Sequence, residues 1–345
     1  MSRLINRSDL AFLTEHPFLP RRLPHRGLDP GHNGCVSVTD RYAPSPTAQL
    51  HLGNLRTALA GWLLTRRSGG RWLMRVEDLD EARVRAAEGV AEQQLEDLRG
   101  LGLDWDGDVV WQSQRLEAYA TAVAALSGRT YECFCTRREI AEASSAPHDD
   151  GHRPYPGTCA RLSSAEAARR REDRPAAIRV RAEGAAFTVT DLQLGEVTGL
   201  VDDFVLVRGD GAYSYNLAVT VDDLAQGVTQ VTRGADLLSS SPRQAWLATQ
   251  LGGTPPRYAH VGLVTNPDGA RLAKRDGSVT LADLAERRWD SRRVLSALTA
   301  SLGLGPQETT TAALEAMPED GLPPAGGAFW LGAVWDDTEG VLRGQ

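Results

Sequence analysis

Lysine is almost absent from this chain of 345 residues. Lysine and arginine together number 38, and only Lys274 is a lysine, so 37 are arginines. With a bias this strong, arginine is expected to stand wherever it can do the work of lysine. The position that keeps lysine is therefore expected to need a compact ammonium group rather than a planar guanidinium. The composition therefore indicates that Lys274 is a functional residue, with chance survival as the alternative.

Other absences limit the class of protein. No apolar run reaches the roughly 18 residues of a membrane-spanning helix, so no membrane partner is expected. Residues 1–35 have no signal-peptide core and are expected to form a poorly ordered arm. Four cysteines are too few for a disulfide framework, which favours a reducing, cytoplasmic setting. The net charge of −7 argues against a general nucleic-acid-binding protein, although a local arginine patch stays possible.

The stretch 41–54, RYAPSPTAQLHLGN, follows a β-branched run and precedes a long apolar helix that is expected to begin at Gly53. A strand, a loop and a helix start in this order favour the binding of an anion at the helix start. The first helical N–H groups are expected to lack partners there, and the positive end of the helix dipole lies there. His51 is placed to donate to a phosphate oxygen, and Gly53 lets a phosphate approach the backbone. A surface loop with an incidental histidine is the alternative.

A second stretch, ARLAKRDGS at 270–278, follows NPDG and contains Lys274. Its glycines and its position in an expected loop are typical of a phosphate-binding lid.

Together the two stretches resemble the signatures of the class I aminoacyl-tRNA synthetases. RYAPSPTAQLHLGN resembles the HIGH motif in the form of the glutamate and glutamine enzymes, and RLAKRDG resembles the KMSKS motif. The first His, the Gly and the second Lys are retained, whereas Leu52 and Asn54 replace Ile and His. In the second motif the replacements are Arg271, Leu272, Ala273 and Arg275. The resemblance runs from about Val36 to Gly303, in the family's order.

Alternation of strands and helices predicts a parallel sheet. A helix at 53–67 and a strand at 71–76 bring Glu77 and Asp78 to a carboxyl edge, where open α/β sheets bind ligands. With the resemblance, this implies an α/β protein with a Rossmann-like class I aminoacyl-tRNA synthetase catalytic domain and a zinc-containing insertion. The expected parts are an arm at 1–35, the first half of the catalytic domain at 36–130, a zinc-binding insertion that contacts the tRNA acceptor at 131–182, the second half with the KMSKS-like loop at 183–303, and a short C-terminal tail at 304–345 without an anticodon-binding domain.

Local patterns predict further elements. They are a helical stripe over 84–101, a helix from about Ser113, a capping box of Ser163 and Glu166 that begins an arginine-rich helix, a hairpin over 205–215 about Asp210 and Gly211, strands at 219–221, 228–231 and 258–264, and a helix from Pro242 to Leu251.

The resemblance implies how ATP would be handled. Activation of an amino acid needs an in-line approach of its carboxylate to the α-phosphate while the leaving pyrophosphate is neutralised. His51, Gly53 and Asn54 are the implied ATP-binding residues, and Lys274 is expected to close over the phosphates in the transition state. Mg²⁺ is expected to arrive with ATP.

The amino-acid site is also implied by matching positions. They are Arg41, Ala43, Ser45, Glu77, Tyr215 and Arg233, which match the glutamate-binding residues of the family. The chemistry fits, because a glutamate side chain asks for guanidinium groups and an α-ammonium asks for a carboxylate. Taken alone, each arginine has a plain surface position as its alternative.

Cys133, Cys135 and Cys159 form a possible zinc site. Three thiolates and one further ligand suffice for a closed tetrahedral structural site with one Zn²⁺ per chain. The residues alone favour His152 as the fourth ligand. The resemblance to short glutamyl-tRNA synthetase paralogues, which place a tyrosine four residues before the last cysteine, indicates Tyr155 instead. Buried free cysteines are the alternative, and Cys35 has no assigned role.

Only about 40 residues follow Gly303, which we expect to be too few for a helical anticodon-binding region. The resemblance therefore points to the glutamyl-queuosine tRNA(Asp) synthetases, stand-alone catalytic paralogues that activate glutamate without tRNA and attach it to queuosine in the anticodon. The implied partners are queuosine-bearing tRNA(Asp), L-glutamate and ATP, with the chain as a monomer. Tyr155, Arg161 and the arginines of 169–174 are the expected tRNA contacts.

Two alternatives stay open at this point. One is a truncated glutamyl-tRNA synthetase that charges the 3′ end of tRNA(Glu). The other is a catalytically inactive, zinc-stapled RNA-binding module, which retention of Lys274 argues against.

Overall fold

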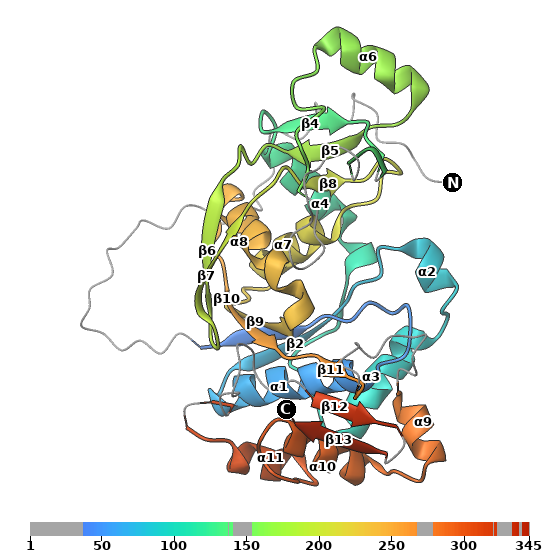
Figure 1. The fold of residues 1–345 in the computed structure, drawn as a ribbon, viewed down its shortest axis with the longest axis vertical. Coiled ribbons are helices and arrows are strands. Elements are labelled where there is room, and N and C mark those ends of the chain that lie inside the picture. Colours follow the sequence, from blue (N-terminus) through green and yellow to red (C-terminus); the bar gives the residue numbers. More distant parts are fainter. Residues whose placement is uncertain are drawn as a thin grey trace, which may run out of the picture. The chain divides into compact units, whose positions relative to one another are not determined.

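The computed structural model describes residues 37–136, 138–140, 154–267, 279–319, 321–322, 333–337 and 340–344 (Figure 1). The chain divides into the units Met1–Ser37 and Val38–Gln345, and the elements described here belong to the second. The predicted arm at 1–35, with Cys35, lies outside the described residues. Within the described part of the chain, no helix is long and apolar enough to cross a membrane.

The first half of the fold is a parallel sheet in the order β1, β2, β3. Its strands are β1 (Thr39–Tyr42), β2 (Arg71–Val76) and β3 (Val110–Trp111), and α1 (Leu52–Arg67) makes the crossover from β1 to β2. Burial of Leu55, Leu59 and Leu63 on one face of α1 explains why this stretch is helical. The strand predicted at 71–76 is confirmed, and the helix predicted at 53–67 begins one residue earlier.

A second sheet has the order β7, β6, β10, β9. Its strands are β6 (Ala186–Asp191), β7 (Gly195–Leu200), β9 (Gln230–Gly234) and β10 (Arg257–Val261). β10 runs parallel to both β9 and β6, whereas β6 and β7 are antiparallel.

Strands β1 and β9 lie side by side and connect the two sheets. The backbone N–H of Thr229 donates to the carbonyl oxygen of Thr39 over 2.9 Å, and the hydroxyl of Thr232 donates to the buried carboxylate of Asp40 over 2.6 Å. Residue numbers rise together along both strands, so β1 and β9 run in the same direction. The carboxyl ends of β1, β2 and β9 therefore share one edge, where the candidate site lies.

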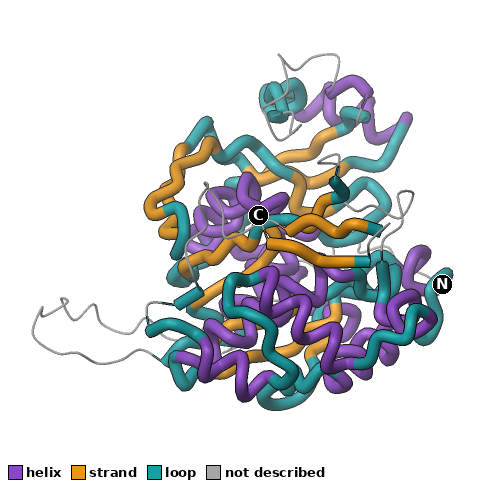
Figure 2. Tube along the Cα trace, turned by 60° about the horizontal axis from the view of Figure 1, so that its bottom comes forward, coloured by secondary structure: helices purple, strands orange, loops and turns teal. Residues whose placement is uncertain are grey.

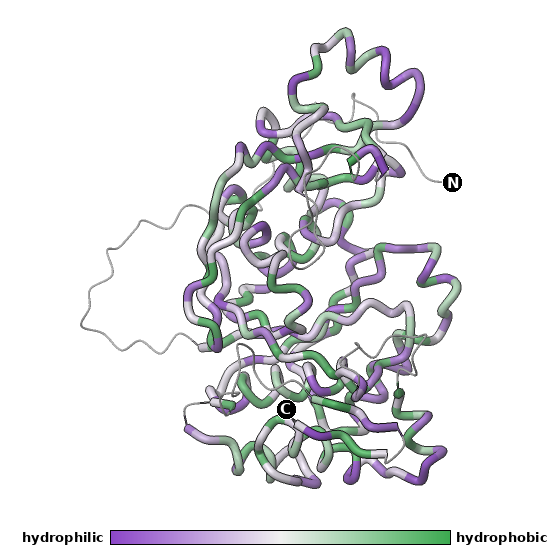
Figure 3. Tube along the Cα trace, viewed as in Figure 1, coloured by the Kyte–Doolittle hydropathy of each residue, from purple (hydrophilic) through white to green (hydrophobic). Residues whose placement is uncertain are grey.

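The predicted insertion contributes to a small antiparallel sheet of β4 (Thr130–Cys133), β5 (Ala177–Val180) and β8 (Val205–Val207). Helix α6 (Ser164–Asp173) begins at the predicted capping box, in which Ser163 and Glu166 exchange hydrogen bonds. None of its residues is buried, and Figure 3 shows strongly hydrophilic residues along it. It is therefore a surface helix of this segment.

Most of the remaining helices are short and begin at a residue whose side chain caps the helix. They are α2 (Glu81–Arg85), α3 (Val90–Gly100), α4 (Leu116–Ala125), α7 (Tyr215–Ala225), α8 (Ser241–Gln250), α9 (Leu281–Glu286), α10 (Ser291–Ser301) and α11 (Thr310–Ala316), with 3₁₀ turns at Gln112–Gln114 and Ala235–Ser240. The helix predicted at 242–251 is confirmed as α8, with proline in its first turn.

Several local predictions were wrong. The strand predicted at 219–221 belongs to α7, which Ser214 caps by accepting from the N–H of Leu217. A short apolar run does not distinguish strand from helix, and here the cap decides. The stripe predicted over 84–101 is broken into α2 and α3. The hairpin predicted over 205–215 is present in part: Val207 forms an antiparallel bridge with Tyr213, and the N–H groups of Arg208 and Ser214 donate to the carbonyl oxygens of Ala212 and Leu206. It ends at Tyr215, which begins α7.

The residues predicted as a short tail contain regular structure. Besides α11, β12 (Ala333–Asp336) and β13 (Val341–Gly344) form an antiparallel pair, and β12 runs parallel to β11 (Val264–Thr265). Trp335 of β12 is 1% exposed and belongs to the same hydrophobic core as Leu55 of α1 and Leu298 of α10. Figure 1 shows β12, β13 and α11 close to α1 and α10, in the lower part of the view that is turned forward in Figure 2.

Candidate active site

The start of α1 places His51 at the predicted phosphate end of the site. His51 is the N-cap residue: its Nδ1 accepts from the N–H of Gly53 over 3.1 Å, and its own N–H donates to Oδ1 of Asn54 over 3.2 Å. Because Nδ1 accepts, a neutral His51 carries its proton on Nε2. Asn54, at the position of the second histidine of HIGH, thus fixes His51 and the helix start.

Gly53 allows the His51 ring to fold over the helix end. A Cβ atom at position 53 would lie 3.0 Å from Cε1 and 3.1 Å from Nδ1 of His51, closer than side chains normally pack. The glycine was predicted to admit a ligand, and the structure gives a more local reason for it: a larger residue displaces the imidazole.

Lys274 lies outside the described residues, but the residues that flank 268–278 lie near the start of α1. The carbonyl oxygen of Val279 accepts from the N–H of Leu52 over 2.9 Å, and Thr280 forms an isolated bridge with His51. On the other side, the Cβ of Val264 lies 3.8 Å from the position of a Cβ on Gly53. Both flanks of the segment that contains Lys274 therefore lie at the start of α1.

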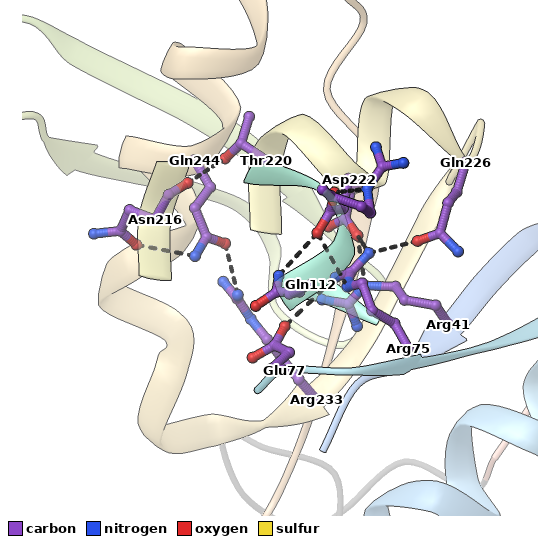
Figure 4. Close-up of polar contacts among 12 residues, drawn as sticks. Arg41, Arg75, Glu77, Gln112, Asn216, Thr220, Asp222, Gln226, Arg233 and Gln244 are labelled. Carbon is purple, nitrogen blue, oxygen red and sulfur yellow. Dashed lines mark hydrogen bonds and ion pairs between the residues drawn. The ribbon is translucent and has the colours of Figure 1, made fainter. Parts of the chain in front are cut away.

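The predicted amino-acid residues come from β1, β2, α7 and β9. Arg41, Glu77 and Arg233 gather around buried charges near the carboxyl ends of these strands (Figure 4). Tyr215 is the first residue of α7 and is 39% exposed, and the charges of Arg233 and Glu77 act on its hydroxyl. The hydroxyl of Tyr42 donates to the carbonyl oxygen of Asn54 over 3.2 Å, which connects this part to the phosphate end.

Ala43 and Ser45 lie in the loop after β1. This loop is tied to β2, because the carbonyl oxygen of Pro44 accepts from the N–H of Glu77 over 3.0 Å. The carbonyl oxygen of Ser45 accepts from the side chain of Gln94, while the residue itself is exposed. The loop therefore adjoins Glu77.

Arg41 presents an unused pair of donors. Its side chain is only 4% exposed, and its Nε donates to Oδ1 of Asp223 over 2.9 Å. Neither Nη atom has a hydrogen-bond partner among the residues that the structure describes, and neither is among the fully enclosed unpaired atoms. Arg41 is therefore held at Nε and offers both Nη groups to a ligand carboxylate.

Arg233 differs, because most of its donors are engaged. Its Nε donates to Nε2 of His260 over 3.2 Å, its Nη1 to Oε1 of Gln244 over 2.7 Å, and its Nη2 to Leu237 O and Ser241 Oγ over 3.1 and 2.7 Å. A guanidinium has five N–H groups, so one Nη1–H is left. Both arginines were expected to bind the glutamate side chain. Among the described residues, Arg41 has both Nη groups open, whereas Arg233 has one Nη1–H left.

Arg75 and its two aspartates are central to the site but were not predicted. Arg75 is fully buried, and its Nη1 shares Oδ1 of Asp223 with Arg41 at 2.8 Å. Its Nη2 lies 3.6 Å from Oε1 of Glu77, and its Nε lies 3.9 Å from Oδ2 of Asp222. The available signal was position: Arg75 lies in β2 and Glu77 follows its last residue, so in an extended chain these two residues share a face. Arg75 thus connects Glu77 to the carboxylate that holds Arg41.

Burial raises the pKa of Glu77 to about 7, although Arg75 and Arg41 act to lower it.

If ionised Glu77 binds the α-ammonium of the substrate, binding weakens as pH falls below 7. We expect the KM for glutamate to be about 30-fold higher at pH 5.5 than at pH 8, because only a few per cent of Glu77 is then ionised. Pyrophosphate exchange measured across this range checks it. Glu77→Gln should have a high, pH-independent KM, and a flat KM in the unmodified chain would contradict the assignment.

Three cysteines and a tyrosine of the inserted segment form a separate cluster. The Sγ atoms of Cys133, Cys135 and Cys159 all lie within 4.8 Å of one another. The hydroxyl of Tyr155 lies 3.4 Å from the Sγ of Cys133 and 3.6 Å from that of Cys135. Ligands of a tetrahedral zinc ion with Zn–S bonds near 2.3 Å are separated by about 3.7 Å. The donor set therefore fits Zn²⁺ with Tyr155 as fourth ligand, while the alternative His152 lies outside the described residues.

Replacing Cys159 by serine is expected to remove bound zinc and to lower the melting temperature, because metal binding contributes directly to the stability of small metal-bound segments. Zinc per chain by elemental analysis and thermal unfolding check this. Cys35→Ser is the matched control and should retain both. Full zinc content in Cys159→Ser would contradict the site.

Comparison with known proteins agrees with these features. Residues 37–315 match the family described as tRNA synthetases class I (E and Q), catalytic domain. The chain is 52% identical to the glutamyl-Q tRNA(Asp) synthetase of Cutibacterium acnes, over 90% of this chain and 92% of the relative. It is 58% identical to the enzyme of the same name from Nocardia farcinica, over 79% and 87%.

The fold comparison is consistent with this. The glutamate-tRNA synthetase of Elizabethkingia anophelis superposes with a TM-score of 0.69 at 24% identity, covering 84% of this chain and 68% of that one. The predicted α/β synthetase fold is thereby confirmed. The chain belongs to the class I tRNA synthetases for glutamate and glutamine, a family of ligases, and within it to the glutamyl-Q tRNA(Asp) synthetases.

Proposed function

We propose that this enzyme uses ATP to form glutamyl-adenylate without tRNA and then transfers glutamate to queuosine in the anticodon of tRNA(Asp). The observation that supports the first half is Arg41, a buried arginine with both Nη groups free of protein partners among the described residues. The names of the relatives support the second half.

The proposed activation step needs no protein nucleophile. A carboxylate oxygen of glutamate attacks the α-phosphorus of ATP, and the bond to the bridging oxygen breaks to release pyrophosphate with its Mg²⁺. The positive end of the α1 dipole and the ring of His51 are assigned to the phosphates. The N–H groups of Leu52 and Gly53, which were expected to lack partners, already donate to the carbonyl oxygen of Val279 and to Nδ1 of His51. Lys274 is assigned to the leaving pyrophosphate, because both flanks of its segment lie at this helix start.

The substrate assignment favours glutamate over glutamine. A neutral amide facing Arg41 would forfeit charge-assisted hydrogen bonds of about 1.5–3 kcal/mol each. Among the described residues, Asp223 holds the side chain of Arg41, so no tRNA is needed to complete its geometry. We therefore expect glutamate-dependent pyrophosphate exchange in the absence of tRNA.

For the tRNA surface, we assign the inserted segment at 131–182, stapled by one zinc ion. Arg171 pairs with Glu132 and Arg174 pairs with Glu139, so these two arginines of the expected cluster already have partners. Arg161 and Arg169 are exposed and have no ion pair at 4 Å or less in the described structure, which makes them the better phosphate contacts.

The test offers radioactive glutamate to tRNA from cells able and unable to make queuosine, followed by nuclease digestion to locate the label. We expect label on the anticodon of queuosine-bearing tRNA(Asp) alone. Label on a 3′-terminal adenosine would instead favour a glutamyl-tRNA synthetase acting on tRNA(Glu). Absence of glutamate-dependent pyrophosphate exchange would favour an inactive RNA-binding module.

A further inference from the structure

His260, a fully buried residue of β10, lies between a carboxylate and the substrate-site arginine. Its Nδ1 is 2.6 Å from Oδ2 of Asp191, the last residue of β6, and its Nε2 is 3.2 Å from Nε of Arg233. Strands β6, β10 and β9 are neighbours in one sheet, so the three side chains form a row across it. None of the motifs in the sequence contains Asp191 or His260.

The hydrogen bonds determine where the imidazole proton lies. Oδ1 of Asp191 accepts from the N–H groups of Gln193 and Leu194 over 2.9 and 3.0 Å, which favours the ionised carboxylate. An ionised Asp191 requires a donor at Nδ1 of His260, and Arg233 can only donate, so Nε2 must accept. His260 is therefore neutral with its proton on Nδ1. Burial lowers its pKa, consistent with this state.

This arrangement controls the orientation of Arg233. Within the described part of the chain, four acceptors surround the guanidinium and leave one Nη1–H: His260, Gln244, Ser241 and the carbonyl of Leu237. The Gln244 amide is itself oriented, because its Nε2 donates to Oδ1 of Asn216 over 3.0 Å. Without the acceptor at Nε2, the buried Nε–H loses its partner, and Ser241, whose hydroxyl lies 3.2 Å from Nε2, loses a neighbour as well. The guanidinium is then held less firmly, by the bonds to Nη1 and Nη2 alone.

We propose that Asp191 and His260 are positioning residues for Arg233, and that they aim its one remaining N–H at the carboxylate of glutamate. The proposal rests on the function proposed above, in which Arg233 binds the substrate. The competing role is purely structural, with His260 serving only to neutralise and cover Asp191.

Two isosteric substitutions separate these roles. His260→Gln places an amide oxygen near the position of Nε2, so Arg233 keeps an acceptor while Asp191 loses its side-chain donor. His260→Asn places an amide N–H near the position of Nδ1, so Asp191 keeps its donor while Arg233 loses its acceptor. A positioning role makes His260→Asn the more harmful change for glutamate binding, whereas a structural role makes His260→Gln the more harmful.

The experiment measures KM for glutamate, KM for ATP and kcat in pyrophosphate exchange. We expect His260→Asn to raise the KM for glutamate about tenfold and His260→Gln to raise it less than threefold, with KM for ATP and kcat within twofold in both. The proposal is overturned if His260→Gln raises the KM for glutamate more than His260→Asn does. It is also overturned if kcat falls as much as the KM rises. Arg233→Gln tests the underlying function separately: an unchanged KM for glutamate there refutes the substrate role of Arg233, whereas a raised KM with normal His260→Asn refutes only the positioning role.

A measurement on the unmodified chain needs no variant to fold. In ¹⁵N NMR of histidine-labelled protein, with His260 assigned through backbone connectivities, the ring should carry its proton on Nδ1 and have a bare Nε2. This is the less common tautomer of free imidazole side chains. Finding the proton on Nε2 would overturn the proposal, because Arg233 would then face a donor.

Discussion

Replacing Arg41 by glutamine is expected to raise the KM for glutamate by roughly 100-fold to 10,000-fold. The change removes both Nη groups, which have no partner among the described residues, and two charge-assisted hydrogen bonds to a ligand contribute about 1.5–3 kcal/mol each. The KM for ATP should stay within about threefold, because the phosphates are assigned to the start of α1. Initial rates of pyrophosphate exchange at varied glutamate measure both constants.

The control must account for the second role of Arg41, its ion pair with Asp223. Arg41→Lys keeps a positive charge near Asp223 but not the planar fork, so it should fall between glutamine and the unmodified chain. Arg66→Gln removes a similar side chain whose partners are Asp104 and Asp106, and it should leave both constants unchanged. A KM for Arg41→Gln within threefold of normal, in a folded protein, would reduce Arg41 to a structural partner of Asp223.

Elements with local chemical signals were predictable from the sequence. The strand at 71–76 is bounded by glycines on one side and by charged residues on the other, and α6 begins at a complete capping box. These signals act within a few residues. The strand predicted at 219–221 failed because Val219 and Val221 fit a pleated strand equally well, and only the cap at Ser214 and packing distinguish the helix.

The supporting network of the site was not predictable, because its contacts join distant parts of the chain. Arg41 and Asp223 are 182 residues apart, and His260 and Asp191 are 69 apart. No short sequence motif contains both members of such a pair. A resemblance identifies residues that match a family's ligand positions. Which N–H groups of Arg41 and Arg233 are already bonded is known only from the folded structure. For the same reason, the residues around Trp335 did not predict that it is buried in the same core as Leu55 of α1.

The second large effect is expected from Lys274→Arg, which keeps the charge. We expect the rate of adenylate formation to fall about 100-fold to 1,000-fold, a typical cost of losing one transition-state contact, with little change in melting temperature or in the KM for glutamate. A compact ammonium with three rotatable donors can follow the departing pyrophosphate, whereas the larger planar guanidinium has fixed donor directions. Single-turnover formation of glutamyl-adenylate isolates this step from binding.

Arg275→Lys is the matched control, since it makes the reverse exchange at the next position, where the KMSKS motif has serine. It should retain near-normal turnover, because no particular cation is required there. Equal loss in both variants would indicate damage to the whole segment, and near-normal turnover of Lys274→Arg would make the single lysine an accident of composition. The flanks at Val264 and Val279 argue against accident, because both lie at the helix start that is assigned to the phosphates. The proposed role of Lys274 on the leaving pyrophosphate therefore rests on these flanks and on its being the one lysine of the sequence.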